Sequence, residues 1–188
     1  MLMASNLMGQ SKFVTSPQLA GFKELITGIN GSITIPESFT ETRAPNNDKL
    51  PFQYGLKFPD ADCEVWFQVN SVKSEWQKFE KVGKLGLNPD SSYLKLAAEE
   101  AKVMSGSEQF LSRPMPSRIL ESYNADEGRS YFITLADLPE TKNYQYALII
   151  VLHKNRQGSV VAVCLTNDKG PTFFRNINKL RYCFRFNG

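Results

Sequence analysis

Few side chains in this sequence could do acid–base chemistry, and His153 is the first to consider. It is the only histidine in the chain, and it follows the apolar run at residues 146–152. An imidazole can act as an acid or a base near neutral pH. The sequence has no Gly-x-Ser-x-Gly motif, and no serine or cysteine stands at a recognisable nucleophile spacing. We therefore favour a structural role for His153 at a strand end, and we predict no catalytic residues and no cofactor.

Three carboxylates have a spacing that could hold a cation. Asp60, Asp62 and Glu64 stand two residues apart, so on a strand their side chains point to the same face. Several oxygen ligands on one side could bind Ca²⁺, although the spacing and the glycine of an EF-hand loop are missing. We favour a solvated entry to a strand, and a cation site at these residues is the alternative.

Four aromatic side chains are candidates for the wall of a ligand site. They are Tyr54, Trp66, Trp76 and Phe79. Small-molecule sites are often lined by aromatic side chains, but aromatic residues on alternating strands more often belong to a core. If these residues bind a ligand, we expect the site between the sheet and residues 70–90, where the sequence is least regular.

Basic and bulky apolar side chains alternate at the end of the chain. Arg175, Lys179, Arg181 and Arg185 follow Pro171 with no acidic residue among them. A basic amphipathic helix can bind an anionic membrane surface or nucleic acid, whereas cations late in a helix also stabilise it through the helix dipole. We favour the structural interpretation, with a helix over residues 170–184 and an extended tail over residues 184–188.

Charge and cysteine content restrict the class of protein. The 188 residues include 22 basic and 19 acidic side chains, a formal net charge of +3, which is too balanced to indicate a polyanionic partner. Cys63, Cys164 and Cys183 are odd in number and form no Cys-x-x-Cys motif, so we expect neither a disulfide framework nor a structural zinc site. We predict buried, inert thiols, and whether one pair is bridged stays open.

The start of the chain is set apart from the rest. Residues 1–15 lack the charged start and the long apolar stretch of a complete signal peptide, yet the small and apolar residues before Ser11 resemble the tail of one. We predict either a signal-peptide remnant, which would place the protein outside the cytoplasm, or a disordered N-terminus. The sequence has no apolar run of about 18 residues, so no membrane-spanning helix is predicted.

Residues 16–188 are predicted to form a single domain. The predicted strands are 31–39, 52–58, 63–71, 127–135, 143–154 and 158–168, the last two buried on both faces because they are continuously apolar. The predicted helices are 16–28, a charged piece within 73–86, 90–106 with Asp90 or Ser91 as cap, and 170–184, with a proline-broken loop at 112–118. This order indicates an α+β fold: an α/β/α sandwich around a central, mainly antiparallel, twisted sheet of about six strands, with helices on both faces.

The order of these elements, with several short motifs, resembles the PsbP-like superfamily. The motifs are ITIPESF, GRSYFITL, ALIIVLHKNRQGSVVAVCL and INKLRYCF, and the resemblance covers about residues 31–186. Cys183 stands where the superfamily commonly has serine before the final phenylalanine. The resemblance implies an α/β/α sandwich, a fold also found in a nuclear Ran-binding family and in uncharacterised bacterial proteins. It implies a non-catalytic accessory or binding role and carries no active-site residues, because a fold does not define a function.

Three hypotheses of function follow. The leading one is a non-catalytic binding or accessory domain of a bacterial protein, secreted or periplasmic if residues 1–15 are a signal remnant. It would bind an unknown protein or small molecule and exist as a monomer or weak homodimer. The alternatives are an enzyme with an unrecognised site near residues 50–80, and a basic C-terminal helix that binds an anionic surface or, less favoured, nucleic acid.

Overall fold

Seven antiparallel strands form the central sheet of the computed structural model, which describes residues 15–59 and 61–188. In chain order they are β2 (Thr40–Thr42), β3 (Tyr54–Lys57), β4 (Cys63–Ser71), β5 (Leu111–Pro114), β6 (Glu127–Thr134), β7 (Tyr146–Lys154) and β8 (Gly158–Thr166). Their order across the sheet is β2-β3-β4-β8-β7-β6-β5. The predicted α+β sandwich is therefore confirmed, with seven strands in the sheet where about six were expected.

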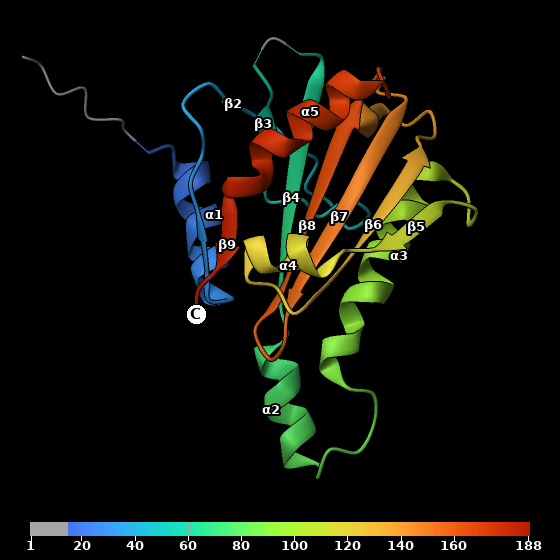
Figure 1. Ribbon diagram of the computed structural model, residues 1–188. Helices are drawn as coiled ribbons and strands as arrows, with labels where there is room; N and C mark the ends of the chain where they lie inside the picture. The colour runs from blue at the N-terminus through green and yellow to red at the C-terminus, as the bar shows by residue number, and fades with distance from the viewer. Residues whose placement is uncertain (1–14, 60) are drawn as a thin grey trace, which may run out of the picture.

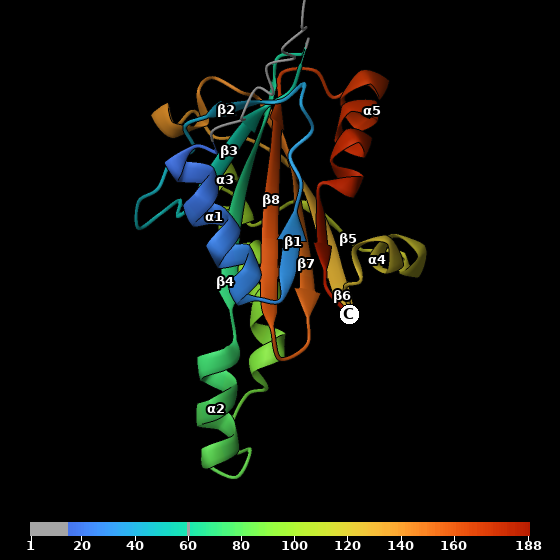
Figure 2. The ribbon, with the colours of Figure 1, turned by 90° about the vertical axis from the view of Figure 1, so that its left-hand side faces the viewer.

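Helices and a small second sheet cover the two faces of this sheet (Figures 1 and 2). The bounds of the helices are α1 (Pro17–Gly28), α2 (Lys73–Lys81), α3 (Ser92–Ser105), α4 (Ser117–Tyr123) and α5 (Pro171–Lys179), with 3₁₀ turns η1 (Pro89–Ser91), η2 (Pro139–Thr141) and η3 (Leu180–Tyr182). One face packs against α3, and the other packs against α1, α4, α5 and the pair β1 (Gly31–Ile33) and β9 (Phe184–Phe186). Among the described residues, no helix combines the length and apolarity required to cross a bilayer.

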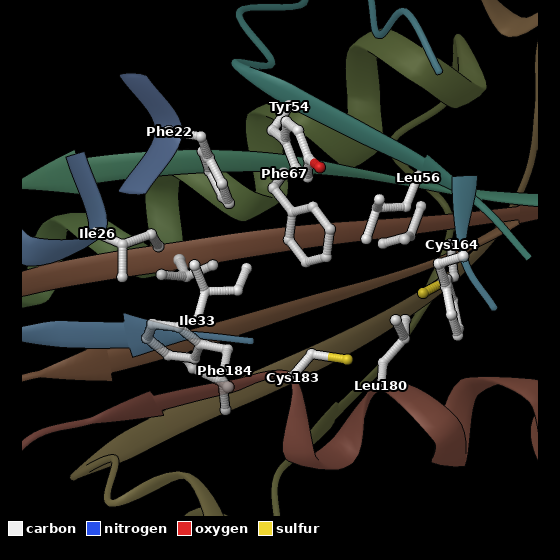
Figure 3. Packing of buried hydrophobic residues seen from close by; sticks show 14 of the residues in the cluster. Phe22, Ile26, Ile33, Tyr54, Leu56, Phe67, Cys164, Leu180, Cys183 and Phe184 are labelled. Atoms are coloured by element: carbon white, nitrogen blue, oxygen red, sulfur yellow. The ribbon is translucent and has the colours of Figure 1, made fainter. Parts of the chain in front are cut away.

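Each face of the sheet has its own core because side chains alternate along every strand. Tyr54 and Phe67 are cross-strand partners that face α1, where Phe22 stacks on Tyr54 with ring centroids 4.8 Å apart. Trp66, the neighbour of Phe67, faces α3 instead and packs against Phe52. Figure 3 shows the first of these cores, in which aromatic side chains from α1, β3, β4 and β9 meet. The predicted hairpin of 52–58 and 63–71 is confirmed, although Phe52 lies on the face opposite to Tyr54.

The two ends of the described chain pair with each other, which the sequence did not predict. Gly31–Ile33 pairs with Phe184–Phe186 and does not join the main sheet. The predicted helix over 170–184 ends at Lys179 and continues as a 3₁₀ turn before the strand. Phe184 and Phe186 are both buried while Arg185 between them is exposed, so the period of two in the tail prevails over the helical period.

Two further predictions of local structure were wrong, the second of them in part. The proline-broken loop over 112–118 contains the edge strand Leu111–Pro114 and the start of the helix Ser117–Tyr123. Proline is tolerated there because an edge strand leaves backbone groups unpaired on one side. Of the two predicted caps of α3, Ser91 occupies the N-cap position but makes no side-chain capping bond. Asp90 does not cap the helix: it lies in η1, where Asn88 is the cap and accepts from the backbone N–H of Asp90.

The first helix is held to the sheet through Glu41, and this yields a first prediction. Ser16 caps the helix as predicted and donates to Glu41 Oε1 at 2.6 Å, while Tyr54 Oη donates to the same oxygen at 2.8 Å. Tyr54→Phe should lower the free energy of unfolding by about 1 kcal/mol, because it removes one hydrogen bond and keeps the ring. Urea denaturation measures this. Tyr182→Phe is the control. Tyr182 is 81% exposed, so removing its hydroxyl should leave the free energy of unfolding unchanged.

Candidate functional site at the projecting helix

The structure separates the four aromatic residues predicted to line a ligand site. Tyr54 and Trp66 are both fully buried, on opposite faces of the sheet. Trp76 and Phe79 lie together on α2, with ring centroids 5.4 Å apart in an edge-to-face arrangement. Only these two share a surface, and it belongs to a helix with no buried residue, which projects beyond the end of the sheet in Figures 1 and 2.

Two of the three carboxylates named as a cation site or a solvated strand entry, Asp62 and Glu64, have protein partners, and Asp62 is also exposed. Asp62 accepts from Tyr144 Oη at 3.4 Å and from Asn167 Nδ2 at 3.1 Å. Glu64 is nearly buried, and its Oε2 accepts from Lys142 Nζ at 2.6 Å and Trp66 Nε1 at 2.9 Å. Asp60 lies outside the described residues. Across 15–59 and 61–188, no three His, Cys, Asp or Glu side chains are grouped so that they could hold a metal.

His153 is fully buried and pairs with an acid that the sequence did not connect to it. Its Nε2 lies 3.1 Å from Asp90 Oδ1, and because an ionised carboxylate only accepts, the imidazole donates there. The ring of Tyr93 stacks on the imidazole at 4.9 Å, and Tyr93 Oη donates to Glu127 at 2.7 Å. Burial, followed by the hydrogen bond to Glu127, raises the pKa of Tyr93 and keeps the phenol protonated.

Ser159 stands directly across the strand pair from His153, so its side chain lies on the same face of the sheet as the His153–Asp90 pair, although no hydrogen bond joins it to His153 within the described chain. Serine, histidine and aspartate are the residue types of a nucleophilic triad. Ser159 is 2% exposed and His153 is 0% exposed, so a substrate cannot reach either side chain in this conformation. Glu64 lies near the opposite end of the strands, about 20 Å away at ~3.4 Å per residue. His153 and Glu64 therefore do not belong to one compact site.

Asp90 anchors the projecting helix to the body of the protein. Besides His153, its Oδ1 accepts from Trp76 Nε1 at 2.9 Å and from the backbone N–H of Arg156 at 2.8 Å. The guanidinium of Arg156 lies 4.6 Å from the centroid of the Trp76 ring, and it pairs with Glu80 at 3.3 Å. One carboxylate oxygen therefore joins α2, η1, β7 and the β7–β8 turn, and α2 is held in place although none of its side chains is buried.

An open hollow of about 470 Å³ lies between α2 and the start of α3, and we call it the α2–α3 hollow. Its apolar lining residues are Phe79, Val82, Leu85, Leu87 and Pro89, and its polar lining residues are Glu75, Lys78, Asn88, Ser91, Ser92 and Lys95. Leu85 is 78% exposed and Leu87 is 89% exposed. With Phe79, Val82 and Pro89 these leucines form a continuous apolar surface, and exposed apolar patches are typical of interaction sites. Of the predicted ligand residues, only Phe79 lines this hollow.

The charge beside the α2–α3 hollow is positive. The basic side chains are Lys73, Lys78, Lys81, Lys84, Lys95 and Arg156, and the acidic ones are Glu75, Glu80, Asp90 and Glu99. Three of the four acids have partners within the described chain, since Glu80 pairs with Arg156, Glu99 pairs with Lys95 at 3.7 Å, and Asp90 accepts the hydrogen bonds described above. The lysines of α2 and of the loop after it form no ion pair within the described chain.

The basic residues of the C-terminus do not form one helical face. Arg175 lies on α5 and donates to Thr172, and Arg181 lies in the 3₁₀ turn and donates to Ser122. Arg185 lies on β9. Because the helix ends at Lys179, the basic amphipathic helix over residues 170–184 is not formed.

No protein-family model, no curated protein and no solved structure matches the chain. The resemblance to the PsbP-like superfamily therefore stays a prediction, and the site must be interpreted from its own residues. Phe79 and the irregularity of residues 70–90 were visible in the sequence. The hydrogen bonds of Asp90 were not, because each joins residues 14 or more positions apart.

Proposed function

We propose that this chain is a non-catalytic binding domain that docks an acidic amphipathic segment of a partner protein in the α2–α3 hollow. The observation that carries the proposal is the pair of exposed leucines, Leu85 and Leu87, beside a concave apolar surface. A concave floor accepts side chains that project from a partner, as in helix-in-groove recognition. The resemblance to the PsbP-like superfamily, which implies a binding or accessory role, points the same way.

The charge around the hollow selects an acidic partner. Lys78 and Lys95 line the hollow on its two sides, and Lys81 and Lys84 belong to the same projecting segment. Opposite charges across an interface favour the correct partner and speed the encounter. Apolar side chains at helical spacing would fill the floor, and carboxylates beside them would meet the lysines.

The hollow is formed before any partner binds, which favours affinity. Asp90 fixes Trp76, and Trp76 supports Phe79 through their edge-to-face contact. A wall that is already ordered loses little conformational entropy on binding. The binding surface therefore depends on the buried hydrogen bonds of Asp90 as well as on the leucines.

A labelled peptide tests the proposal directly. The probe is a 14-residue fluorescein peptide with leucines at i, i+3, i+4 and i+7 and glutamates on its other face, measured by fluorescence anisotropy. We expect saturable binding that Leu85→Ser/Leu87→Ser weakens by at least about tenfold, since burial of one leucine contributes about 1.5–3 kcal/mol. Leu25→Ser is the matched control, because Leu25 is 43% exposed on α1 and remote from the hollow.

Two further measurements separate the alternatives. A peptide with lysines in place of the glutamates should bind more weakly, and equal binding of the two peptides would contradict the role of the lysines. Vesicles of phosphatidylcholine with phosphatidylserine are the second arm. If the protein binds these vesicles through Leu85 and Leu87 and does not bind the acidic peptide, the surface binds membranes and the proposal is wrong.

A further inference from the structure

A second hollow lies on the opposite face of the sheet, beside α5, and we call it the α5 groove. Its volume is about 400 Å³, and it is lined by Leu111, Arg113, Ser130, Phe132, Leu148, Lys169 and Phe174. It exists because the layer of α1, α5 and the β1–β9 pair leaves this face of β5, β6 and the start of β7 incompletely covered. A hollow of this size falls within the range of about 300–1,000 Å³ typical of small-molecule sites.

The floor of the α5 groove is apolar and partly exposed. Phe132 stacks on Tyr146 with ring centroids 6.2 Å apart and lies 6.5 Å from the ring of Phe174. Phe174 is 46% exposed, although it belongs to a helix whose other phenylalanine, Phe173, is 1% exposed. An exposed phenylalanine at the edge of an apolar floor leaves a surface that a ligand could cover.

The same sheet face continues from the groove into an enclosed apolar seam under α5 and η3. Leu148 of the groove is the cross-strand partner of Cys164, and Ile150 is the partner of Ala162 in the seam. The seam holds only about 40 Å³, enough for the end of a narrow chain. Figure 3 shows Cys164 on the sheet, with Leu180 and Cys183 projecting toward it from η3 and the residue that follows.

The seam is uncharged at neutral pH. Burial raises the pKa of Cys164 and raises that of Cys183 to about 11, so both thiols stay protonated. Burial also raises the pKa of Tyr123, which lines the seam, to about 12. An alkyl chain could enter such a space, whereas a charged group could not.

Positive charge is confined to the outer part of the groove. Arg113 and Lys169 both line it, and no acidic residue does. Neither side chain forms an ion pair within residues 15–59 and 61–188. The Lys169 ammonium lies 4.5 Å from the centroid of the Tyr146 ring, which keeps it beside the floor. Two unpaired cations next to an apolar surface complement a ligand with an alkyl chain and an anionic head.

We propose that the α5 groove binds a long-chain carboxylate, with the carboxylate at the exposed rim that Arg113 and Lys169 line and the chain on Phe132, Leu148 and Phe174. The end of the chain points toward the seam beneath Leu180. Arg113 can bind the carboxylate through two parallel N–H donors, and Lys169 adds a second charge. This site is independent of the α2–α3 hollow, which lies on the far side of the sheet beyond its end.

Isothermal titration with sodium dodecanoate, below its micelle concentration, tests the site in the intact chain. We expect one ligand per chain. Arg113→Ala/Lys169→Ala should weaken dodecanoate binding by at least about tenfold, which corresponds to about 1.4 kcal/mol. The same variant should leave binding of uncharged dodecanol within about twofold, because the lost bonds are made only to the charged head. Dodecyltrimethylammonium should not bind, since its head is repelled by both cations.

A second variant tests the floor without disturbing the core. Phe174→Ser should weaken the binding of dodecanoate and of dodecanol alike. Tyr182→Ser is the matched control, because Tyr182 is exposed on η3 and lines no part of the groove. Leu85→Ser/Leu87→Ser should leave dodecanoate binding unchanged, which separates this site from the α2–α3 hollow. Absence of dodecanoate binding, or equal binding to the double-alanine variant, would refute the proposal.

Discussion

Asp90→Ala should lower the free energy of unfolding by about 3 kcal/mol and release α2 from the body of the protein. Three donors converge on Asp90 Oδ1, from His153, Trp76 and the backbone of Arg156. His153 is fully buried, so its N–H would lose its partner without gaining water. An unsatisfied buried donor costs about 1–3 kcal/mol, and each of the two other lost hydrogen bonds costs about 0.5–1.5 kcal/mol. Trp76 is half-buried and Arg156 is exposed, so water can replace Asp90 as the acceptor for these two N–H groups, which keeps the total loss at about 3 kcal/mol.

Urea denaturation measures the loss of stability, and hydrogen exchange of the α2 amides measures the release of the helix. Asp48→Ala is the control, because Asp48 is exposed in the loop before β3 and its carboxylate makes no hydrogen bond within the described chain. Asp90→Ala should also weaken binding of the acidic peptide, since α2 forms one wall of the α2–α3 hollow. Unchanged exchange in α2 would mean that the helix is held by something other than Asp90.

The role of Asp90 shows where sequence reasoning ends in this protein. Its position before a helix-forming run favours a capping role, and that local rule is sound, but Asn88 fills the role two residues earlier. The bond from Asp90 to His153 joins residues 63 positions apart. Spacing rules describe neighbours within a helix or strand, so they cannot reveal a pair that only the register of β7 and the path of η1 bring together.

The hairpins and the helices over residues 16–28 and 90–106 were predictable because the apolar residues of each follow the spacing of one kind of secondary structure only. The alternation of 54, 56 and 58 and the apolar runs of β7 and β8 each specify a buried face. The C-terminus satisfies two periods, and the choice between them depends on what lies beside it. Gly31–Ile33 is that neighbour, more than 150 positions earlier. A Cβ at Gly31 would lie 2.9 Å from the ring of Phe184, which shows how closely the two segments approach.

The candidate site was predictable only in part, for the same reason. The expectation of a ligand site near residues 70–90 rests on irregular sequence and on Trp76 and Phe79, and these two do share a surface. Tyr54 and Trp66 belong to cores on opposite faces of the sheet. Tyr54 is paired with Phe67, and Trp66 precedes Phe67 on the same strand, so the alternation of side chains along the strand places Trp66 on the face opposite to Tyr54. The pairing itself depends on the register of β3 and β4, which the five intervening residues do not specify uniquely.

Glu100 makes the stability of this protein depend on pH in the opposite sense to most acids. It is 5% exposed on the buried side of α3, and its Oε2 has no hydrogen-bond partner within the described chain. Burial, with a smaller contribution from Glu99, raises the pKa of Glu100 from 4.5 to about 7. Between these two values the unfolded chain is ionised at this residue while the folded chain holds its proton. Stability from this group is therefore greatest below pH 4.5, falls as the pH rises to about 7, and is flat above it.

Glu100→Gln should remove that dependence, because an amide of nearly the same shape stays neutral at every pH. One pKa unit corresponds to about 1.4 kcal/mol, so the variant should be more stable than the parent by about 3 kcal/mol at pH 8 and by less than about 1 kcal/mol at pH 5. Urea denaturation of both proteins at the two pH values measures the difference, in which all other titrating groups cancel. Glu99→Gln is the matched control: Glu99 is exposed and pairs with Lys95, so most of the pH dependence should remain. A Glu100→Gln variant that gains no stability at pH 8 would mean that water or another side chain already compensates the buried carboxylate.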